Sequence, residues 1–452
     1  MIDVKRLRIA VLALVLAPLA ACSSIPNPMD MFPGRNHNAD TAPTDGRISI
    51  LSFEQTLRTG TDDVLPTVTL PTAYVNSVWP QPGGYPTHAL QHTQASGNLD
   101  VAWRRSIGQG SNNDRRLNAR PVIAEGKIFA GDASGRVTAL DADSGSQIWS
   151  IRLGVPNRHD RMAFGSGLAY DSGRIYAHSG FNFFVALDAE TGAEIWRTET
   201  LVPFHGAPTV VDGRVFVTSD DNELLALDAT TGAVLWTYQG IIETARLLTG
   251  PSPAVLGDIV VAPFASGELV ALRVQNGNPV WSDSLTRAGG LTAMSEINDV
   301  AGSPVIMDGT VYAMSHSGTL VAIELRTGER VWTQPAGGLH TPWVAGDFLY
   351  LVTSEAELVC LNRNTGIVHW MTQLDLFENP NRRKNRIAWA GPVLAGGRVF
   401  LASSRGDAVV VNAYDGEVIR QYGLGAPVFV APVIANETVY VVTDDARLIA
   451  LR

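Results

Sequence analysis

The sequence predicts an all-β fold, an eight-bladed β-propeller of four-stranded antiparallel blades, on three observations. The pattern Asp-x-x-Thr-Gly-x-x-x-Trp and close variants recur from about residue 98 to the C-terminus, at steps of 38 to 51 residues. The segments between these markers alternate apolar and polar residues and are rich in β-branched and aromatic side chains, which is typical of short strands. The two ends of the repetitive region complement each other. A period of this length with complementary ends indicates a closed ring of sheets.

The first 22 residues have the order of a secretory signal. Basic residues lie at positions 5, 6 and 8, followed by the apolar run 9–16 and by Leu-Ala-Ala directly before Cys22. This ending resembles the lipobox of bacterial lipoproteins, in which the cysteine is lipidated after cleavage, and Ser23 in place of Asp implies sorting to the outer membrane. We expect residues 1–21 to be a lipoprotein signal peptide and Cys22 to carry the lipid. The alternative is an ordinary secretory signal with a chance cysteine.

Residues 22–97 are predicted to be the lipidated N-terminus and a flexible tether rich in Pro and Gly. Polar and turn-forming residues are scattered through this stretch and apolar periodicity is weak, so it offers little surface to bury against the entropy of ordering. A part near residues 74–79 remains open as a segment that packs on the folded domain or on a partner.

The repeated marker predicts a tight hairpin in each blade. The Asp is suited to accept backbone N–H groups across the turn, and the Gly supplies the positive φ that the turn requires. The tryptophan is expected to wedge between neighbouring sheets. The expected blade tryptophans are Trp103, Trp149, Trp196, Trp236, Trp281, Trp332 and Trp370. Arg420 stands in the seventh unit where the pattern has tryptophan, so one contact between blades is expected to differ.

The last unit predicts how the ring closes. It begins at Pro432 and ends at the C-terminus without a final strand, whereas residues 99–107, with Trp103, match that strand and precede the first unit. The N-terminal strand therefore completes the last blade, and the propeller domain is expected to cover residues 98–452.

Composition and motifs exclude several classes of function. The chain has 44 acidic against 34 basic residues, a formal net charge of −10, and no dense basic face for nucleic acid. No zinc, calcium or phosphate-binding motif is present, so neither a metal nor a catalytic residue is expected. Cys360 lies in an apolar run and is interpreted as a small buried core residue. Outside the N-terminus no apolar run is long enough to span a membrane, so attachment is expected through the lipid anchor alone.

The repeat resembles that of the pyrroloquinoline-quinone propeller superfamily, over residues 99–452. The superfamily includes quinone-dependent dehydrogenases and non-catalytic relatives. Quinoprotein alcohol dehydrogenases typically place a disulfide between adjacent cysteines over the cofactor, and Cys22 and Cys360 cannot form one. This departure implies a protein that is not an enzyme and has no cofactor.

With its lipobox, tether and propeller, the chain resembles the BamB family of lipoproteins of the bacterial outer-membrane β-barrel assembly machinery. The resemblance implies a non-catalytic scaffold on the periplasmic face of the outer membrane. Its partners would be the POTRA domains of BamA and other subunits of the machinery, with unfolded barrel precursors as a further candidate.

In that family, loops on one face of the propeller bind the POTRA domains, and two loops match here. The first, Glu243–Pro253, offers Arg246, Leu247 and Leu248, although the arginine precedes the leucines instead of following them. The second, Met294–Pro304, offers Glu296, Ile297 and Asp299, with Ala301 where the family has a second acid. The resemblance implies that these six residues bind the partner, as an apolar anchor with a polar rim. Otherwise they are ordinary connections between blades.

Two alternative functions stay open at this point. The first is a periplasmic quinone-dependent dehydrogenase or sensor, and the second is a propeller scaffold of another envelope complex. The basic run of residues 381–386 is also unassigned: it is either a solvated loop or a contact for acidic partners or phospholipid head groups.

Overall fold

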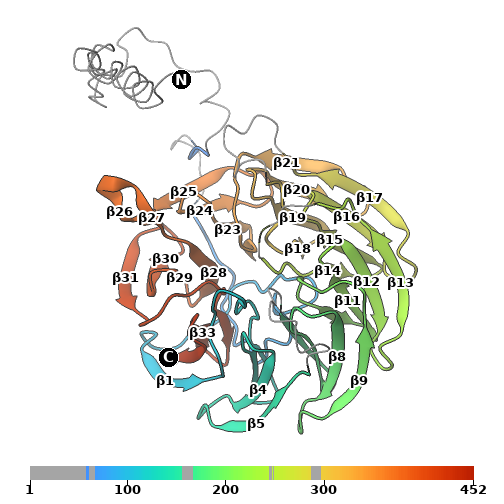
Figure 1. Cartoon of the computed structure of the whole chain (residues 1–452). Coiled ribbons are helices and arrows are strands. Elements are labelled where there is room, and N and C mark those ends of the chain that lie inside the picture. Colours follow the sequence, from blue (N-terminus) through green and yellow to red (C-terminus); the bar gives the residue numbers. More distant parts are fainter. Residues whose placement is uncertain (1–56, 61–66, 155–165, 244–246, 248, 287–296) are drawn as a thin grey trace, which may run out of the picture. The chain divides into compact units, whose positions relative to one another are not determined.

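The described part of the chain is a ring of eight four-stranded sheets, as the sequence predicted (Figure 1). The computed structural model describes residues 57–60, 67–154, 166–243, 247, 249–286 and 297–452. All of them belong to one unit, Gln55–Arg452, which is separate from Met1–Glu54.

Each blade is an antiparallel meander whose first strand is innermost and whose fourth is outermost. Blades 1 to 4 consist of β2 (Val122–Ala124), β3 (Lys127–Gly131), β4 (Arg136–Asp141) and β5 (Gln147–Arg152); β6 (Gly167–Asp171), β7 (Arg174–His178), β8 (Phe183–Asp188) and β9 (Glu194–Glu199); β10 (Thr209–Val211), β11 (Arg214–Thr218), β12 (Glu223–Asp228) and β13 (Val234–Gln239); and β14 (Ala254–Leu256), β15 (Ile259–Pro263), β16 (Glu268–Arg273) and β17 (Pro279–Ser284).

The second half of the ring repeats this order. Blades 5 to 8 consist of β18 (Val305–Met307), β19 (Thr310–Met314), β20 (Leu320–Glu324) and β21 (Arg330–Gln334); β22 (Trp343–Ala345), β23 (Phe348–Val352), β24 (Glu357–Asn362) and β25 (Val368–Gln373); β28 (Trp389–Ala395), β29 (Arg398–Ser403), β30 (Asp407–Asn412) and β31 (Val418–Gly423); and β32 (Val433–Ala435), β33 (Thr438–Val442), β34 (Arg447–Leu451) and β1 (Val101–Ser106). A hairpin between blades 6 and 7 adds β26 (Phe377–Asn379), the 3-10 turn η4 (Pro380–Arg382) and β27 (Lys384–Arg386).

The N-terminal strand closes the ring. β1 pairs antiparallel with β34 from Val101 opposite Leu451 to Ser106 opposite Arg447. The last blade therefore takes its outermost strand from the start of the domain. With this strand the blade has four strands like the others, and the ring is closed.

The blade tryptophans link neighbouring sheets through one repeated contact. The Trp149 indole N–H of blade 1 donates to the Ala189 carbonyl of blade 2 at 3.0 Å, and the ring covers Gly192 in the outer turn of blade 2. A Cβ at Gly192 would lie 2.9 Å from the ring, so the turn needs glycine for close approach as well as for its φ of 75°. The same N–H-to-carbonyl bond is made by Trp196, Trp236, Trp281, Trp332 and Trp370.

Two positions depart from this contact at the ring closure. Trp103 packs on Gly145, but its buried indole N–H has no partner within the described residues. Arg420 takes the tryptophan position in blade 7 and binds the Asn98 carbonyl at 2.8 Å and the Asp100 carboxylate at 2.9 Å. In blade 7 an ionic contact between Arg420 and the segment that leads into β1 thus replaces the tryptophan contact, as expected from the change of residue.

The predicted tether is too long at its C-terminal end, because residues 67–97 are part of the folded body. Trp79 and Leu90 are 2% and 3% exposed, and residues 74–96 follow the inside of the ring. We call residues 74–96 the inner belt. It contacts the blades in the order 8, 1, 2, 3, 4, 5, 6, 7 and 8 again, through Asn76, Trp79, Pro80, Gln81, Pro86, Thr87, Gln91, Thr93 and Ser96.

The inner belt forms hydrogen bonds with backbone N–H and carbonyl groups on the free edges of the innermost strands. Trp79 and Ile123 exchange two backbone hydrogen bonds of 2.7 and 2.8 Å, and the Gln81 amide binds both the N–H and the carbonyl of Val210. An innermost strand has one side without a strand partner, and its N–H and carbonyl groups must be paired when buried. The turn-forming residues that led to the prediction of a tether thus belong to a segment whose backbone bends through a full circle.

Candidate partner-binding site

The structure brings the two predicted partner loops together. One loop connects β13 to β14 and the other connects β17 to β18, so both lie on the face where one blade passes to the next. The backbone N–H of Leu247 donates to the Asp299 carboxylate at 3.0 Å. Two residues 52 positions apart in the sequence are thereby in direct contact.

Asp299 forms hydrogen bonds within this face, and its side chain is buried. It is 4% exposed, and its carbonyl accepts the backbone N–H of His316 at 2.9 Å. Burial lowers the pKa of His316, against the opposing effect of the Asp299 carboxylate. Asp299 therefore joins both loops to blade 5, which differs from the exposed rim residue that the sequence suggested.

Of the remaining predicted residues, only Leu247 and Ile297 are described, and both are partly exposed. Arg246, Leu248 and Glu296 lie outside the described residues, as does the lipidation site Cys22.

An apolar pair that sequence reasoning missed lies just before the first loop, in the same connection from β13 to β14. Ile241 and Ile242 are 57% and 63% exposed. The backbone at Ile241 is fixed on both sides: its N–H donates to Glu268 at 3.0 Å, and its carbonyl accepts from the Asn222 amide at 2.6 Å. The signal available in the sequence was a pair of adjacent apolar residues one position beyond the end of an outermost strand. We call Ile241, Ile242, Leu247 and Ile297 the partner face.

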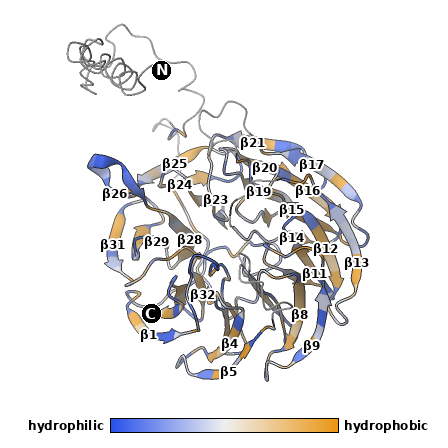
Figure 2. Ribbon diagram, viewed as in Figure 1, coloured by the Kyte–Doolittle hydropathy of each residue, from blue (hydrophilic) through white to orange (hydrophobic). Residues whose placement is uncertain are grey.

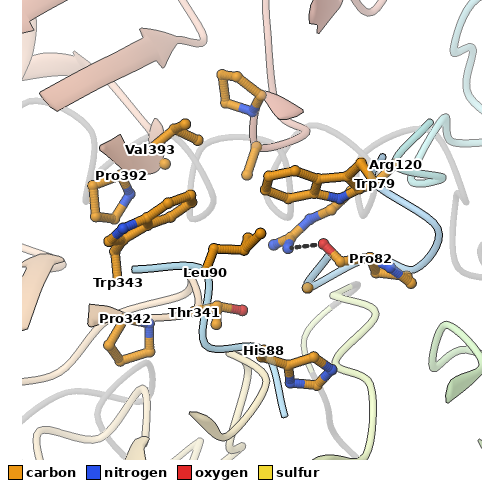
Figure 3. Close-up of a pocket in the computed structure, with 14 residues that line it drawn as sticks. Trp79, Pro82, His88, Leu90, Arg120, Thr341, Pro342, Trp343, Pro392 and Val393 are labelled. Atoms are coloured by element: carbon orange, nitrogen blue, oxygen red, sulfur yellow. Dashed lines mark hydrogen bonds between the residues drawn. The ribbon is translucent and has the colours of Figure 1, made fainter. Parts of the chain in front are cut away.

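The inner belt lines the central channel of the ring, and a pocket lies where the belt meets the innermost strands of blades 6 and 7 (Figure 3). Trp79 of the belt lies 6.2 Å from Trp343 between ring centroids, and Arg120 donates to the Pro82 carbonyl at 3.0 Å. The pocket between these side chains is about 20 Å³, room for about one water molecule.

Burial shifts the pKa values of the ionisable groups in and near this cavity. Burial lowers the pKa of Arg120 to about 10, which leaves it charged at neutral pH. It lowers the pKa of His88 to about 4 and of His340 to about 3, and both are therefore neutral. Among the described residues, no group of three or more His, Cys, Asp and Glu side chains is arranged to hold a metal ion. Nor does this part of the chain contain a helix long and apolar enough to cross a membrane.

Comparison with known proteins identifies relatives over most of the domain. A family model described as outer membrane protein assembly factor BamB matches residues 133–372 and 378–452. The outer membrane protein assembly factor BamB of Salmonella typhimurium is 30% identical over 355 residues, which cover 78% of this chain and 88% of that protein.

Solved structures show the same fold. The crystal structure of BamB from Moraxella catarrhalis superposes with a TM-score of 0.65 at 19% identity, covering 77% of this chain and all of that one. A europium-containing methanol dehydrogenase gives the same TM-score at 15% identity, over 81% of this chain and 89% of that one. At these identities the structural likeness supports the propeller fold alone.

Proposed function

Because the chain belongs to the BamB family of outer membrane protein assembly factors, we propose that it is a scaffold of the β-barrel assembly machinery. The observation that carries this proposal is the family match over residues 133–372 and 378–452. It spans nearly the whole ring, including both loops that form the partner face.

We propose that the partner face binds the POTRA domains of BamA. Protein interfaces draw their affinity from a few apolar anchors that leave water on binding. Ile241 and Ile242 offer exposed apolar side chains, and the Ile241 backbone is held by two hydrogen bonds. The Asp299 carboxylate accepts the N–H of Leu247. The surface is thus organised before a partner arrives, which reduces the ordering entropy that binding costs. Held this way, POTRA domains would keep one orientation while barrel precursors are folded and inserted.

We further propose that Cys22 anchors the chain to the periplasmic face of the outer membrane. The support is the signal-like order of residues 1–21 and the Leu-Ala-Ala-Cys ending. With the inner belt assigned to the body, the proposed tether is shortened to residues 22–56.

The dehydrogenase alternative has less support. The methanol dehydrogenase shares the fold at only 15% identity, and in this chain the inner belt pairs with the innermost strands along the inside of the ring. We therefore propose a non-catalytic role.

The test is a mild-detergent pull-down of the tagged full-length protein from bacterial envelopes, with mass spectrometry and an absorbance scan. We expect BamA among the captured proteins and no quinone chromophore. A bound quinone without BamA would contradict the proposal and favour the dehydrogenase.

A further inference from the structure

We propose that the hairpin of residues 377–386 is a second membrane contact that binds anionic phospholipid head groups. We call these residues the basic hairpin. This inference rests on the proposed lipid anchor, because it concerns what the anchored body does near the membrane surface.

The basic hairpin concentrates positive charge in an acidic protein. It holds four basic residues and one acid, whereas the whole chain carries a formal net charge of −10. Figure 2 shows it as a strongly hydrophilic projection at the edge of the ring, labelled β26. Residues 378–386 are all exposed.

The hairpin is rigid enough to present these charges together. β26 and β27 pair antiparallel, with Phe377 opposite Arg386. At the tip, the Asn379 side chain accepts the Arg382 backbone N–H at 3.1 Å, and the Arg383 N–H donates to the Pro380 carbonyl at 3.3 Å.

Three of its cations form no ion pair among the described residues, and the hairpin's own acid, Glu378, accepts a hydrogen bond from the Asn385 amide instead. Arg386 forms an ion pair with Glu355 at 3.0 Å, and the nearby Asp375 is paired with Arg405 at 2.9 Å. Within the described residues, Arg382, Arg383 and Lys384 form no ion pair. Arg383 instead lies over the Phe377 ring, 5.7 Å from its centroid. Their charge is therefore available to an external anion.

The position of the hairpin favours a membrane over a protein as the source of that anion. The chain that comes from the proposed anchor joins the body at blade 6, where the Gly60 N–H donates to the Val368 carbonyl at 2.9 Å and Leu57 is buried. Val368 begins β25, and the basic hairpin follows the end of the same strand. The membrane end of the chain and the free cations thus flank one strand.

The proposed tether would keep the hairpin within reach of the surface. A flexible linker has a root-mean-square length of about 5–6 Å times √n, roughly 32 Å for the 34 residues 23–56. Such a linker leaves the orientation of the body open, and it makes a weak second contact effectively intramolecular. Clustered Lys and Arg near an anionic surface supply that contact. The hairpin would therefore turn blades 6 and 7 toward the membrane.

The test measures the distance of the hairpin from the lipid surface in the full-length lipidated protein. A donor dye is placed at Asn381→Cys, and energy transfer to a lipid-borne acceptor is recorded on phosphatidylcholine vesicles with and without phosphatidylglycerol. Labelling is selective because Cys360 is fully buried and Cys22 would carry the lipid. The reference site is Leu201→Cys, which is 99% exposed on the connection from blade 2 to blade 3.

We expect more transfer from position 381 than from position 201 on vesicles with phosphatidylglycerol, and loss of this excess at high salt. The variant Arg382→Ser, Arg383→Ser, Lys384→Ser should lose the excess. The matched variant Arg104→Ser, Arg152→Ser, Arg326→Ser removes the same charge from three scattered exposed sites and should keep it.

Equal transfer from both sites, or an excess that survives the hairpin substitutions, would overturn the inference. An excess that appears only after an acidic protein partner is added would overturn it in favour of a protein contact. Failure to attach to pure phosphatidylcholine vesicles would count against the lipid anchor instead. Co-sedimentation of the same protein with phosphatidylglycerol vesicles would then decide: binding lost in the hairpin variant supports the inference, and no binding contradicts it.

Discussion

At the scale of single residues, the tryptophan contact between blades is the unit from which the ring is built. Trp236 illustrates it: its indole N–H donates to the Val274 carbonyl at 3.0 Å, and its ring covers Gly277 of the next blade. Both the residue and its wedge position were predictable, because the spacing from Gly to Trp is nearly constant. The identity of the accepting carbonyl was not, since it depends on how two sheets are rotated against each other.

Replacing Trp236 tests the contact. We expect Trp236→Ala to lower the free energy of unfolding by about 3 kcal/mol, the lower end for a tryptophan because the ring is only partly buried. Trp236→Phe, which keeps most of the packing but removes the N–H donor, should cost about 1 kcal/mol. Chemical denaturation followed by circular dichroism measures both. Equal losses in the two variants would show that the hydrogen bond, not the packing, dominates.

Buried neutral histidines predict an acid-sensitive fold. Burial lowers the pKa of His178 to about 4, although the Gly206 carbonyl accepts a bond from its ring, and His88 of the inner belt is lowered to about 4 as well. An unfolded histidine titrates near 6.5, so the unfolded state binds more protons between pH 6.5 and 4. The stability that these two neutral histidines contribute is fully present above pH 6.5 and is lost as the pH falls to about 4.

The expected loss is on the order of 3 kcal/mol for each of these histidines over that range. Melting temperatures recorded between pH 7 and pH 4 measure it. His88→Gln should flatten the dependence, whereas Gln94→Ala, which removes a non-titrating side chain of the same belt, should leave it unchanged. A melting temperature that is constant down to pH 4 would contradict the assignment.

At the scale of elements, the inner belt is the feature that sequence reasoning placed wrongly. Its prolines, glycines and polar residues have no periodicity of 2 or 3.6, because the segment follows a circle and belongs to no sheet or helix. Its partners are the innermost strands of all eight blades, from 44 residues away in the sequence for Ile123 to 358 for Ile434. No local pattern carries that information.

A polar contact of the belt provides the test at this scale. Gln81→Ala should lower the free energy of unfolding by about 2–4 kcal/mol, since it leaves the buried N–H and carbonyl of Val210 without a partner. Gln94→Ala is the matched control, because the Gln94 side chain makes no hydrogen bond among the described residues. Similarly small decreases in the free energy of unfolding of both variants would show that the belt lies inside the ring without stabilising the fold.

At the scale of the whole molecule, the repeats and their complementary ends were sufficient to predict the closed eight-bladed ring. The partner face was only partly predictable. Leu247 and Asp299 could be matched to family loops, but the burial of Asp299 arises from contacts between two blades. Ile241 and Ile242 were overlooked because apolar residues after a strand are ordinary in sequence and become distinctive only when they are exposed.

The central claim, that this face docks the propeller on BamA, is tested most directly by quantifying BamA captured with the tagged protein from envelopes. The comparison is between the unmodified chain and the double variant Leu247→Ala, Leu248→Ala, with Leu201→Ala as a control on another exposed loop. We predict a loss of BamA of about tenfold or more in the double variant, at unchanged melting temperature, and no loss in the control. Undiminished capture of BamA by a folded double variant would contradict the account.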